Sequence, residues 1–175
     1  IDSLDILKSQ KPNILIVILE GFTAKIIGAL GGDSTITPNF NNLVKEGVLF
    51  ENYYASGDRT DKGLISILSG YPAQTKTSII TYTGKSEKLP NLTLDLKKQG
   101  YHTSFLYGGD VNFANMNSYL NICGFSEVIK KSHFNINHLS ANFFLKTSIF
   151  SFFSNSSFIF SKSWLTISQL WLNSS

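Results

Sequence analysis

Asn13-Ile-Leu-Ile-Val-Ile-Leu-Glu20 is the stretch that decides the fold, because it is an unbroken aliphatic run that ends in an acid. Such a run is typical of a strand buried on both faces in a parallel sheet. In open α/β sheets, ligands bind just outside the carboxyl ends of the strands. Glu20 is therefore a candidate for contact with a cation or a substrate.

The segments after this run alternate between helix and strand signals. Thr37 to Gly47 has a Thr N-cap, Pro at the first helical position and a closing Gly, which together predict a short helix. Further strands are predicted over residues 48–54 and 101–107, and further helices over residues 62–69 and 89–100. This alternation predicts an α/β layered domain.

One threonine stands at the start of a predicted helix, in Ala55-Ser-Gly-Asp-Arg-Thr-Asp-Lys-Gly63. A hydroxyl at such a turn, facing an acidic strand end, is how a metal-dependent phosphoryl or sulfuryl transferase presents its nucleophile. The helix start adds N–H groups and a positive dipole end. Arg59 and Lys62 are candidates for neutralising charge on the transferred group, or are surface residues. The alternatives without a catalytic role are that Thr60 is only an N-cap and Glu20 only a surface acid.

Charge and cysteine content exclude several classes of protein. The net charge is +3, and the fifteen Lys and Arg are scattered, so a nucleic-acid footprint is not indicated. The mild basicity fits an anionic small-molecule substrate. A single cysteine, Cys123, excludes an internal disulfide and a cysteine-rich zinc site. Residues 1–10 are interpreted as a linker without a signal peptide, so that any export signal would lie upstream.

The composition changes sharply toward the end of the chain. All glycines and prolines fall at or before Gly124, and no Asp or Glu follows Glu127. Residues 131–175 are interpreted as an atypical Phe/Ser-rich tail with neither helical nor strand periodicity, as a frameshift or a truncated gene would produce. A membrane span is the weaker interpretation, because Lys146, Lys162 and many serines interrupt the apolar residues.

Several motifs in order carry a resemblance to a known family. They are Lys11-Pro-Asn-Ile-Leu-Ile-Val-Ile-Leu-Glu20, Thr37-Pro-Asn39, Glu46-Gly47, Gly57-Asp-Arg-Thr60, Gly70-Tyr-Pro72, Leu89-Pro90, Gly100-Tyr101 and Tyr107-Gly-Gly-Asp-Val-Asn-Phe-Ala-Asn-Met116. Together they resemble the sulfatase-type domain of the lipoteichoic acid synthase and phosphoglycerol transferase family, in the alkaline phosphatase superfamily. The resemblance covers residues 11–129. It implies that residues 11–130 are the N-terminal part of an alkaline-phosphatase-like three-layer α/β/α domain that is truncated here.

The resemblance also implies roles for individual residues. Glu20 and Thr60 would be metal ligands, Thr60 would also be the nucleophile, and the metal would be Mn²⁺ or Mg²⁺, with Zn²⁺ as an alternative. Asp110, Asn112 and Asn115 would line the substrate pocket, although Gly108-Gly109-Asp110 is also an ordinary turn.

The chain departs from the family pattern in its metal ligands and histidines. It has no Asp-His pair, so two ligands would hold a divalent ion poorly. His102 is interpreted as structural, and His133 and His138 cannot be assigned. Cys123 lies outside any Cys-x-Pro-x-Arg pattern, which weighs against a standard sulfatase nucleophile.

Three functions follow from these implications. The first is transfer of phosphoglycerol, or a similar phosphodiester head group, from a phospholipid to a glycan or lipid acceptor through a covalent phosphothreonine. It implies an extracytoplasmic domain of the cell membrane, held there by segments absent from this chain. The second is a sulfatase or phosphodiesterase type of hydrolase from the same superfamily. The third is an inactive remnant, which the missing ligands favour for this chain.

Overall fold

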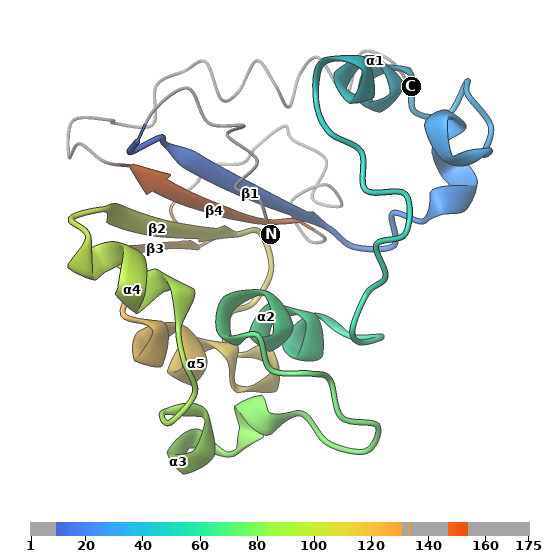
Figure 1. Ribbon diagram of the computed structural model, residues 1–175. Coiled ribbons are helices and arrows are strands. Elements are labelled where there is room, and N and C mark those ends of the chain that lie inside the picture. Colours follow the sequence, from blue (N-terminus) through green and yellow to red (C-terminus); the bar gives the residue numbers. More distant parts are fainter. Residues whose placement is uncertain (1–9, 131–132, 134–146, 154–175) are drawn as a thin grey trace. The chain divides into compact units, whose positions relative to one another are not determined.

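The computed structural model describes residues 10–130, 133 and 147–153 (Figure 1). The chain divides into two compact units. Of the described residues, 10–20 and those from 55 onward belong to the first unit, and residues 21–54 belong to the second. The linker predicted at residues 1–10 therefore lies almost entirely outside the described residues, as does most of the predicted tail.

A four-stranded sheet forms the centre of the first unit. Its strands are β1 (Ile14–Leu19), β2 (His102–Tyr107), β3 (Glu127–Lys130) and β4 (Thr147–Phe153), in the order β1-β4-β2-β3. β2 and β3 are parallel, whereas β4 is antiparallel to both of its neighbours. β1 and β2 therefore run in the same direction.

The register places the ends of β1 and β2 at one edge of the sheet. Leu19 lies opposite Thr147, and Tyr107 lies opposite Ser148, the next residue of β4. The carboxyl ends of these two parallel strands therefore lie together, at the edge where an α/β sheet meets its ligands.

Four helices of the first unit lie on one side of this sheet (Figure 1). They are α2 (Thr60–Ser69), α3 (Thr83–Ser86), α4 (Leu92–Lys98) and α5 (Met116–Cys123). The buried core between helices and sheet contains Leu64 and Leu68 of α2, Phe105 of β2, and Tyr119 of α5. The remaining described elements of this unit are 3-10 turns at Ile79–Thr81 and Phe113–Asn115. The fold class is therefore α/β, as predicted, with the sheet and one helix layer in the described residues.

The helix boundaries follow from capping residues in the sequence. The Asn91 side chain accepts hydrogen bonds from the N–H groups of Thr93 and Leu94, which fixes the start of α4. α2 ends at Gly70, which has a φ of 62° and donates its N–H to the Ser66 carbonyl. Glycine adopts this left-handed conformation without the steric cost of a Cβ atom, so the helix stops there.

The second unit is smaller and mostly helical. It contains 3-10 turns at Ala24–Ile26 and Gly28–Leu30, followed by α1 (Pro38–Glu46). The Thr37 hydroxyl donates to the Ile26 carbonyl at 2.9 Å, and the rings of Phe22 and Phe40 are 5.3 Å apart. The predicted helix after Thr37 is confirmed.

Two structural predictions are wrong. Residues 48–54 do not form a strand, and Val48, Phe50 and Tyr54 are exposed. β-branched and aromatic residues favour a strand only when a neighbouring strand pairs with them. β1 is also not buried on both faces: Leu15 and Val17 are exposed, because the described helices of this unit cover only the opposite face.

β4 lies in the stretch that was interpreted as a tail without periodicity. Its seven residues pair with both β1 and β2, so at least this part of the chain belongs to the sheet. Among the described residues, none of the helices is long and apolar enough to span a bilayer.

Candidate active site

Glu20 and Thr60 lie together at the carboxyl edge of the sheet. Glu20 follows β1 directly, Thr60 is the first residue of α2, and the Thr60 hydroxyl donates a hydrogen bond to the Glu20 carboxylate. Forty positions separate the two residues in the sequence. The fold therefore creates the juxtaposition of hydroxyl and acid that the sequence predicted.

Thr60 does not act as the N-cap of α2. Arg59 occupies that position, and the hydroxyl of Thr60 is directed to Glu20 instead of to the helix backbone. The Lys62 and Gly63 N–H groups both donate to the Arg59 carbonyl. The N–H groups of Thr60 and Asp61 precede these and have no intrahelical acceptor, so they are available to an anion at the helix start.

Asp61 is a residue of this region that sequence reasoning missed. It is buried in the first turn of α2, and its Oδ1 atom has no hydrogen-bond partner among the described residues. The nearest opposite charge is the Arg59 Nε atom at 3.7 Å, on a side chain that is 60% exposed. In the sequence, only the position of Asp61 directly after Thr60 could have indicated this residue. Arg59 thus has a carboxylate partner two residues away, directly after Thr60.

Lys62 has a different partner from the one that the sequence suggested. Its ammonium lies 2.9 Å from the Asp58 carboxylate and also donates to the Thr75 carbonyl at 3.4 Å. The hydrogen bond from Lys62 lowers the pKa of Asp58 below its ordinary value. The charge of Lys62 is therefore already balanced by Asp58. An action of Lys62 on a transferred group remains a prediction.

Tyr107 is a second residue that sequence reasoning missed. Burial raises the pKa of this phenol, and the nearby carboxylates of Glu20 and Asp110 raise it further. A Cβ atom on Gly109 would lie 2.8 Å from the Tyr107 ring, so only glycine lets the loop pass so close. The place of Tyr107 at the end of the predicted strand 101–107 could have indicated this residue. Tyr107 places a phenol at the carboxyl edge, between the Glu20 and Asp110 charges.

Asp110, Asn112 and Asn115 all lie in the loop after β2. Asp110 is exposed, and its carboxylate accepts a hydrogen bond from the Asn112 N–H at 2.9 Å. Asn115 has a positive φ of 61° and donates its side-chain N–H to the Ile80 carbonyl at 2.8 Å. Asn115 is therefore engaged in holding the loop, whereas Asp110 is exposed and its charge helps to raise the pKa of Tyr107.

The donor types at this edge fit a hard divalent cation, but their number does not complete a site. Glu20 and Thr60 offer one carboxylate and one hydroxyl, and the described residues contain no group of three His, Cys, Asp or Glu side chains able to hold a metal. Hard cations bind six or more oxygen ligands, shared between protein, water and substrate. The described part of the chain thus supplies only part of the coordination shell of a divalent cation.

In the described part of the chain, His133 and Cys123 belong to no group of three possible metal ligands. His133 accepts a hydrogen bond from the Lys130 N–H at 2.9 Å, and His138 lies outside the described residues. Cys123 is buried in the core, where burial raises the pKa of its thiol and Asn91 donates to its sulfur. A thiol in this state is a poor nucleophile.

The α/β fold and its similarity to a solved structure show that the class is alkaline-phosphatase-like. A solved structure from Vibrio parahaemolyticus, described as a protein in the alkaline phosphatase superfamily, is similar to this chain with a TM-score of 0.58 and 31% identity. The similarity covers 67% of this chain and 29% of that one. Residues 12–146 match the Sulfatase family, and the chain belongs to that family.

Curated relatives of the chain are named as sulfatases. An arylsulfatase of Clostridium perfringens is 27% identical over 69% of this chain, and an N-acetylglucosamine-6-O-sulfatase of Bacteroides thetaiotaomicron is 26% identical over 57%. The human N-acetylgalactosamine-6-sulfatase is 31% identical over 35%. The chain spans about a quarter or less of the length of these relatives, with 24%, 18% and 12% respectively. The sulfatase family is thus shown, whereas the comparisons do not single out lipoteichoic acid synthases.

Proposed function

We propose that this chain carries the nucleophile half of a hydrolase that cleaves sulfate or phosphate esters through Thr60. The contact between the Thr60 hydroxyl and the Glu20 carboxylate carries this proposal. The names of the relatives favour ester hydrolysis over phosphoglycerol transfer.

The geometry supports attack by Thr60 with Glu20 as the proton acceptor. The Thr60 oxygen would form a bond to the sulfur or phosphorus of the ester, while the bond from that atom to the leaving oxygen breaks. The proton of the Thr60 hydroxyl already points to Glu20, which can accept it as a general base. The unpaired N–H groups at the start of α2 then stabilise the negative charge on the transferred group. Water finally cleaves the threonine ester and regenerates the hydroxyl.

A divalent cation, Mn²⁺ or Mg²⁺ in the proposal and Zn²⁺ as an alternative, would be held in part by Glu20 and Thr60. When bound, such an ion lowers the pKa of a coordinated hydroxyl and offsets charge on the ester. The described residues contain no group of three such side chains, so water, substrate or residues outside the described ranges would complete the shell.

Phosphoglycerol transfer is a second candidate because the nucleophile is a threonine. A threonine ester of phosphate forms by the same displacement, and a glycan or lipid hydroxyl would replace water as the acceptor. In this case the donor would be a phospholipid, and the domain would work on the extracytoplasmic side of the membrane. The two candidates share Thr60 and differ only in the acceptor.

Peptide mass spectrometry tests the shared step. The 175-residue chain is incubated with Mn²⁺ and either p-nitrophenyl sulfate or bis(p-nitrophenyl) phosphate, and the reaction is stopped in acid. We expect an adduct on the peptide that contains Thr60, absent in Thr60→Ala and retained in Thr83→Ala. Thr83 is a matched control because it is the first residue of α3 and is exposed. The ester that gives the adduct identifies the transferred group, and added glycerol tests for transfer.

The same experiment decides whether the chain is catalytic at all. No adduct with either ester would refute the proposal and leave the third function, a remnant that does not react. Equal adducts on Thr60 and Thr83 would also refute it, because they would reflect unspecific modification.

A further inference from the structure

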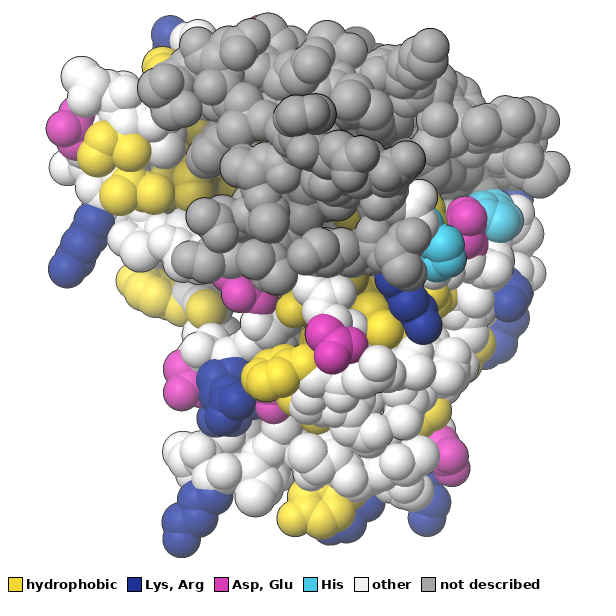
Figure 2. Space-filling model, turned by 180° about the vertical axis from the view of Figure 1, so that it is seen from behind, with side chains coloured by type: hydrophobic (Ala, Val, Ile, Leu, Met, Phe, Trp, Pro, Cys, Tyr) yellow, Lys and Arg dark blue, Asp and Glu magenta, His cyan; other side chains and the backbone are white. Residues whose placement is uncertain are grey.

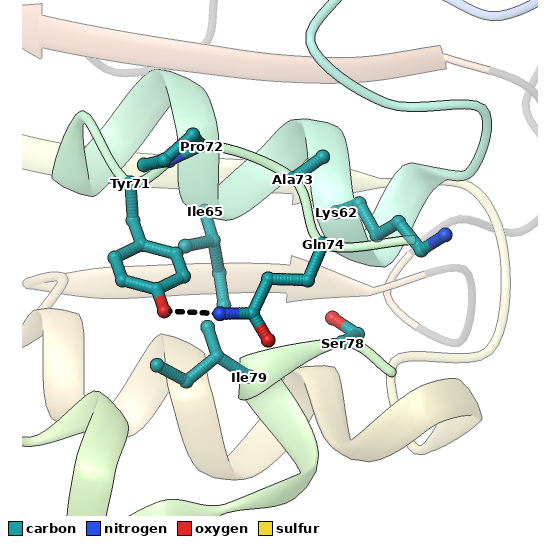
Figure 3. Close-up of a pocket in the computed structure, with 8 residues that line it drawn as sticks. All are labelled: Lys62, Ile65, Tyr71, Pro72, Ala73, Gln74, Ser78 and Ile79. Carbon is teal, nitrogen blue, oxygen red and sulfur yellow. Dashed lines mark hydrogen bonds between the residues drawn. The ribbon is translucent and has the colours of Figure 1, made fainter. Parts of the chain in front are cut away.

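The side chain of Lys62 is largely buried, in the first turn of the helix that begins with Thr60. Only 10% of this side chain is exposed. Figure 3 shows it extended from α2 beside the segment that contains Ala73 and Gln74. Lysine side chains are rarely buried unless their charge is paired. The burial of Lys62 therefore points to a role inside the protein.

The Lys62 ammonium joins two segments that lie on either side of α2 in the sequence. It lies 2.9 Å from the carboxylate of Asp58, which precedes the helix, and donates to the carbonyl of Thr75, which follows it, at 3.4 Å. A second hydrogen bond connects the same two segments, from the Ala73 N–H to the Ser56 hydroxyl at 3.0 Å. The turn before α2 is thus tied to the segment after it.

The aliphatic part of Lys62 packs against the backbone of this turn. A Cβ atom on Gly57 would lie 2.9 Å from the Lys62 Cβ atom and 3.5 Å from its Cδ atom. Only a residue without a side chain lets the lysine stem pass so close. The stem and the ammonium of Lys62 therefore restrain the same turn.

The restraint extends to the peptide bond that leads into Thr60. The Lys62 N–H donates to the Arg59 carbonyl at 3.1 Å, and this carbonyl belongs to the peptide bond between Arg59 and Thr60. Arg59 is the N-cap of α2, but within the described residues its side chain makes no capping hydrogen bond. Side-chain caps normally fix the start of a helix. Here Lys62 holds both residues before Thr60, through its main chain at Arg59 and through its ammonium at Asp58.

We infer that Lys62 is a positioning residue, which fixes the turn before α2 so that the Thr60 hydroxyl meets the Glu20 carboxylate. Its ammonium acts on Asp58 and Thr75 and not on the charged group of an ester. The effect of Lys62 on the contact between Thr60 and Glu20 is independent of catalysis, whereas its effect on ester cleavage rests on the proposed function.

The energetic coupling between Glu20 and Thr60 tests this role without requiring catalysis. It is measured by urea unfolding of Glu20→Ala, Thr60→Val and the combined variant, in the wild-type chain and in Lys62→Met. Methionine keeps most of the aliphatic stem and leaves no unpaired buried charge. We expect Lys62→Met to reduce the coupling by about half or more. Lys98→Met is the matched control, because it removes the ammonium of another Lys–Asp pair of 2.9 Å, on α4, and should leave the coupling unchanged.

An unchanged coupling in Lys62→Met would overturn the inference, even if the variant is less stable, because Lys62 would then be only a general structural residue. If Lys62→Met does not fold, Asp58→Asn decides instead. The Asp58 side chain is 77% exposed, so its replacement is tolerated. Asp58→Asn should reduce the coupling in the same direction, and an unchanged coupling would again overturn the inference.

The rate of adduct formation on Thr60 tests the consequence for catalysis. Lys62→Met should slow this step about tenfold to a hundredfold, because the nucleophile is displaced, at an unchanged half-saturating concentration of the ester. A higher half-saturating concentration at an unchanged rate would overturn the inference, because it would show that Lys62 binds the ester. If the wild-type chain forms no adduct, the proposed function fails, and the coupling still decides the role of Lys62.

Discussion

Gly57→Ala should destabilise the first unit, whereas Gly63→Ala should stabilise it. A Cβ atom on Gly57 would lie 2.9 Å from both the Ala73 and the Lys62 Cβ atoms, whereas ordinary carbon contacts are about 3.5–4.0 Å. Relieving two such contacts requires movement of the loop or of α2, at a cost of about 1–3 kcal/mol. Gly63 lies inside α2 with nothing within 4 Å of an added Cβ atom. Alanine there should therefore raise the free energy of unfolding by about 0.5–1 kcal/mol.

Urea and thermal unfolding of the two variants check this prediction. A change of 1 kcal/mol corresponds to a shift in Tm of about 2–4 °C for a chain of this size. Gly57→Ala should therefore lower Tm by roughly 2–12 °C, and Gly63→Ala should raise it by roughly 1–4 °C. The reasoning is refuted if both variants shift Tm in the same direction by similar amounts. Such a result would show that the loop of Gly57 does not pack against Ala73 and α2.

Three further predictions concern the core and the metal site. Tyr119→Phe should lower the free energy of unfolding by about 1–3 kcal/mol, because it removes the 2.6 Å hydrogen bond to Ser69 and leaves a buried hydroxyl unpaired; unchanged urea unfolding would contradict this. Burial raises the pKa of Tyr119 and of Cys123, so the unfolded chain loses these protons first as pH rises. Stability should accordingly be complete below the ordinary pKa of 9.0 for the Cys123 thiol and fall above it; a Tm that stays constant from neutral to strongly alkaline pH would be inconsistent with burial of both groups. Calorimetric titration with Mn²⁺ should give a Kd no tighter than about 10⁻⁴ M, because Glu20 and Thr60 supply only two ligands, and micromolar binding would mean that other residues complete the shell.

The sequence was sufficient to predict an element where a local signal and the fold agree. The aliphatic run of β1 and the glycine that ends α2 predicted their elements. The pairing of Glu20 with Thr60 could also be predicted, because an acid after a strand and a hydroxyl at a helix start meet at the same edge of an α/β sheet.

The parts that could not be predicted depend on long-range contacts. β4 was missed because its Phe and Ser residues carry no strand period, and only pairing with β1 and β2 makes it a strand. Residues 48–54 were predicted as a strand for the opposite reason, since strand-forming residues there have no pairing partner in the structure. The closeness of Tyr107 to Glu20 and the contact of Lys62 with the Thr75 carbonyl required the packing of segments that lie apart in sequence.

The exposed charges on the described surface are of both signs. Figure 2 shows basic and acidic side chains interspersed on the face displayed, without a large area of one sign. The Arg59–Asp61 and Lys62–Asp58 pairs show the same local balance beside the candidate site.

A double-mutant cycle on the stability of Glu20→Ala, Thr60→Val and the combined variant tests the central claim most directly. The claim is that the fold brings these two side chains into contact, so their effects on the free energy of unfolding must depend on each other. For a partly exposed hydrogen bond to a carboxylate, we predict a coupling of about 0.5–1.5 kcal/mol. Additive effects, with a coupling below about 0.3 kcal/mol, would contradict the contact on which the candidate active site depends.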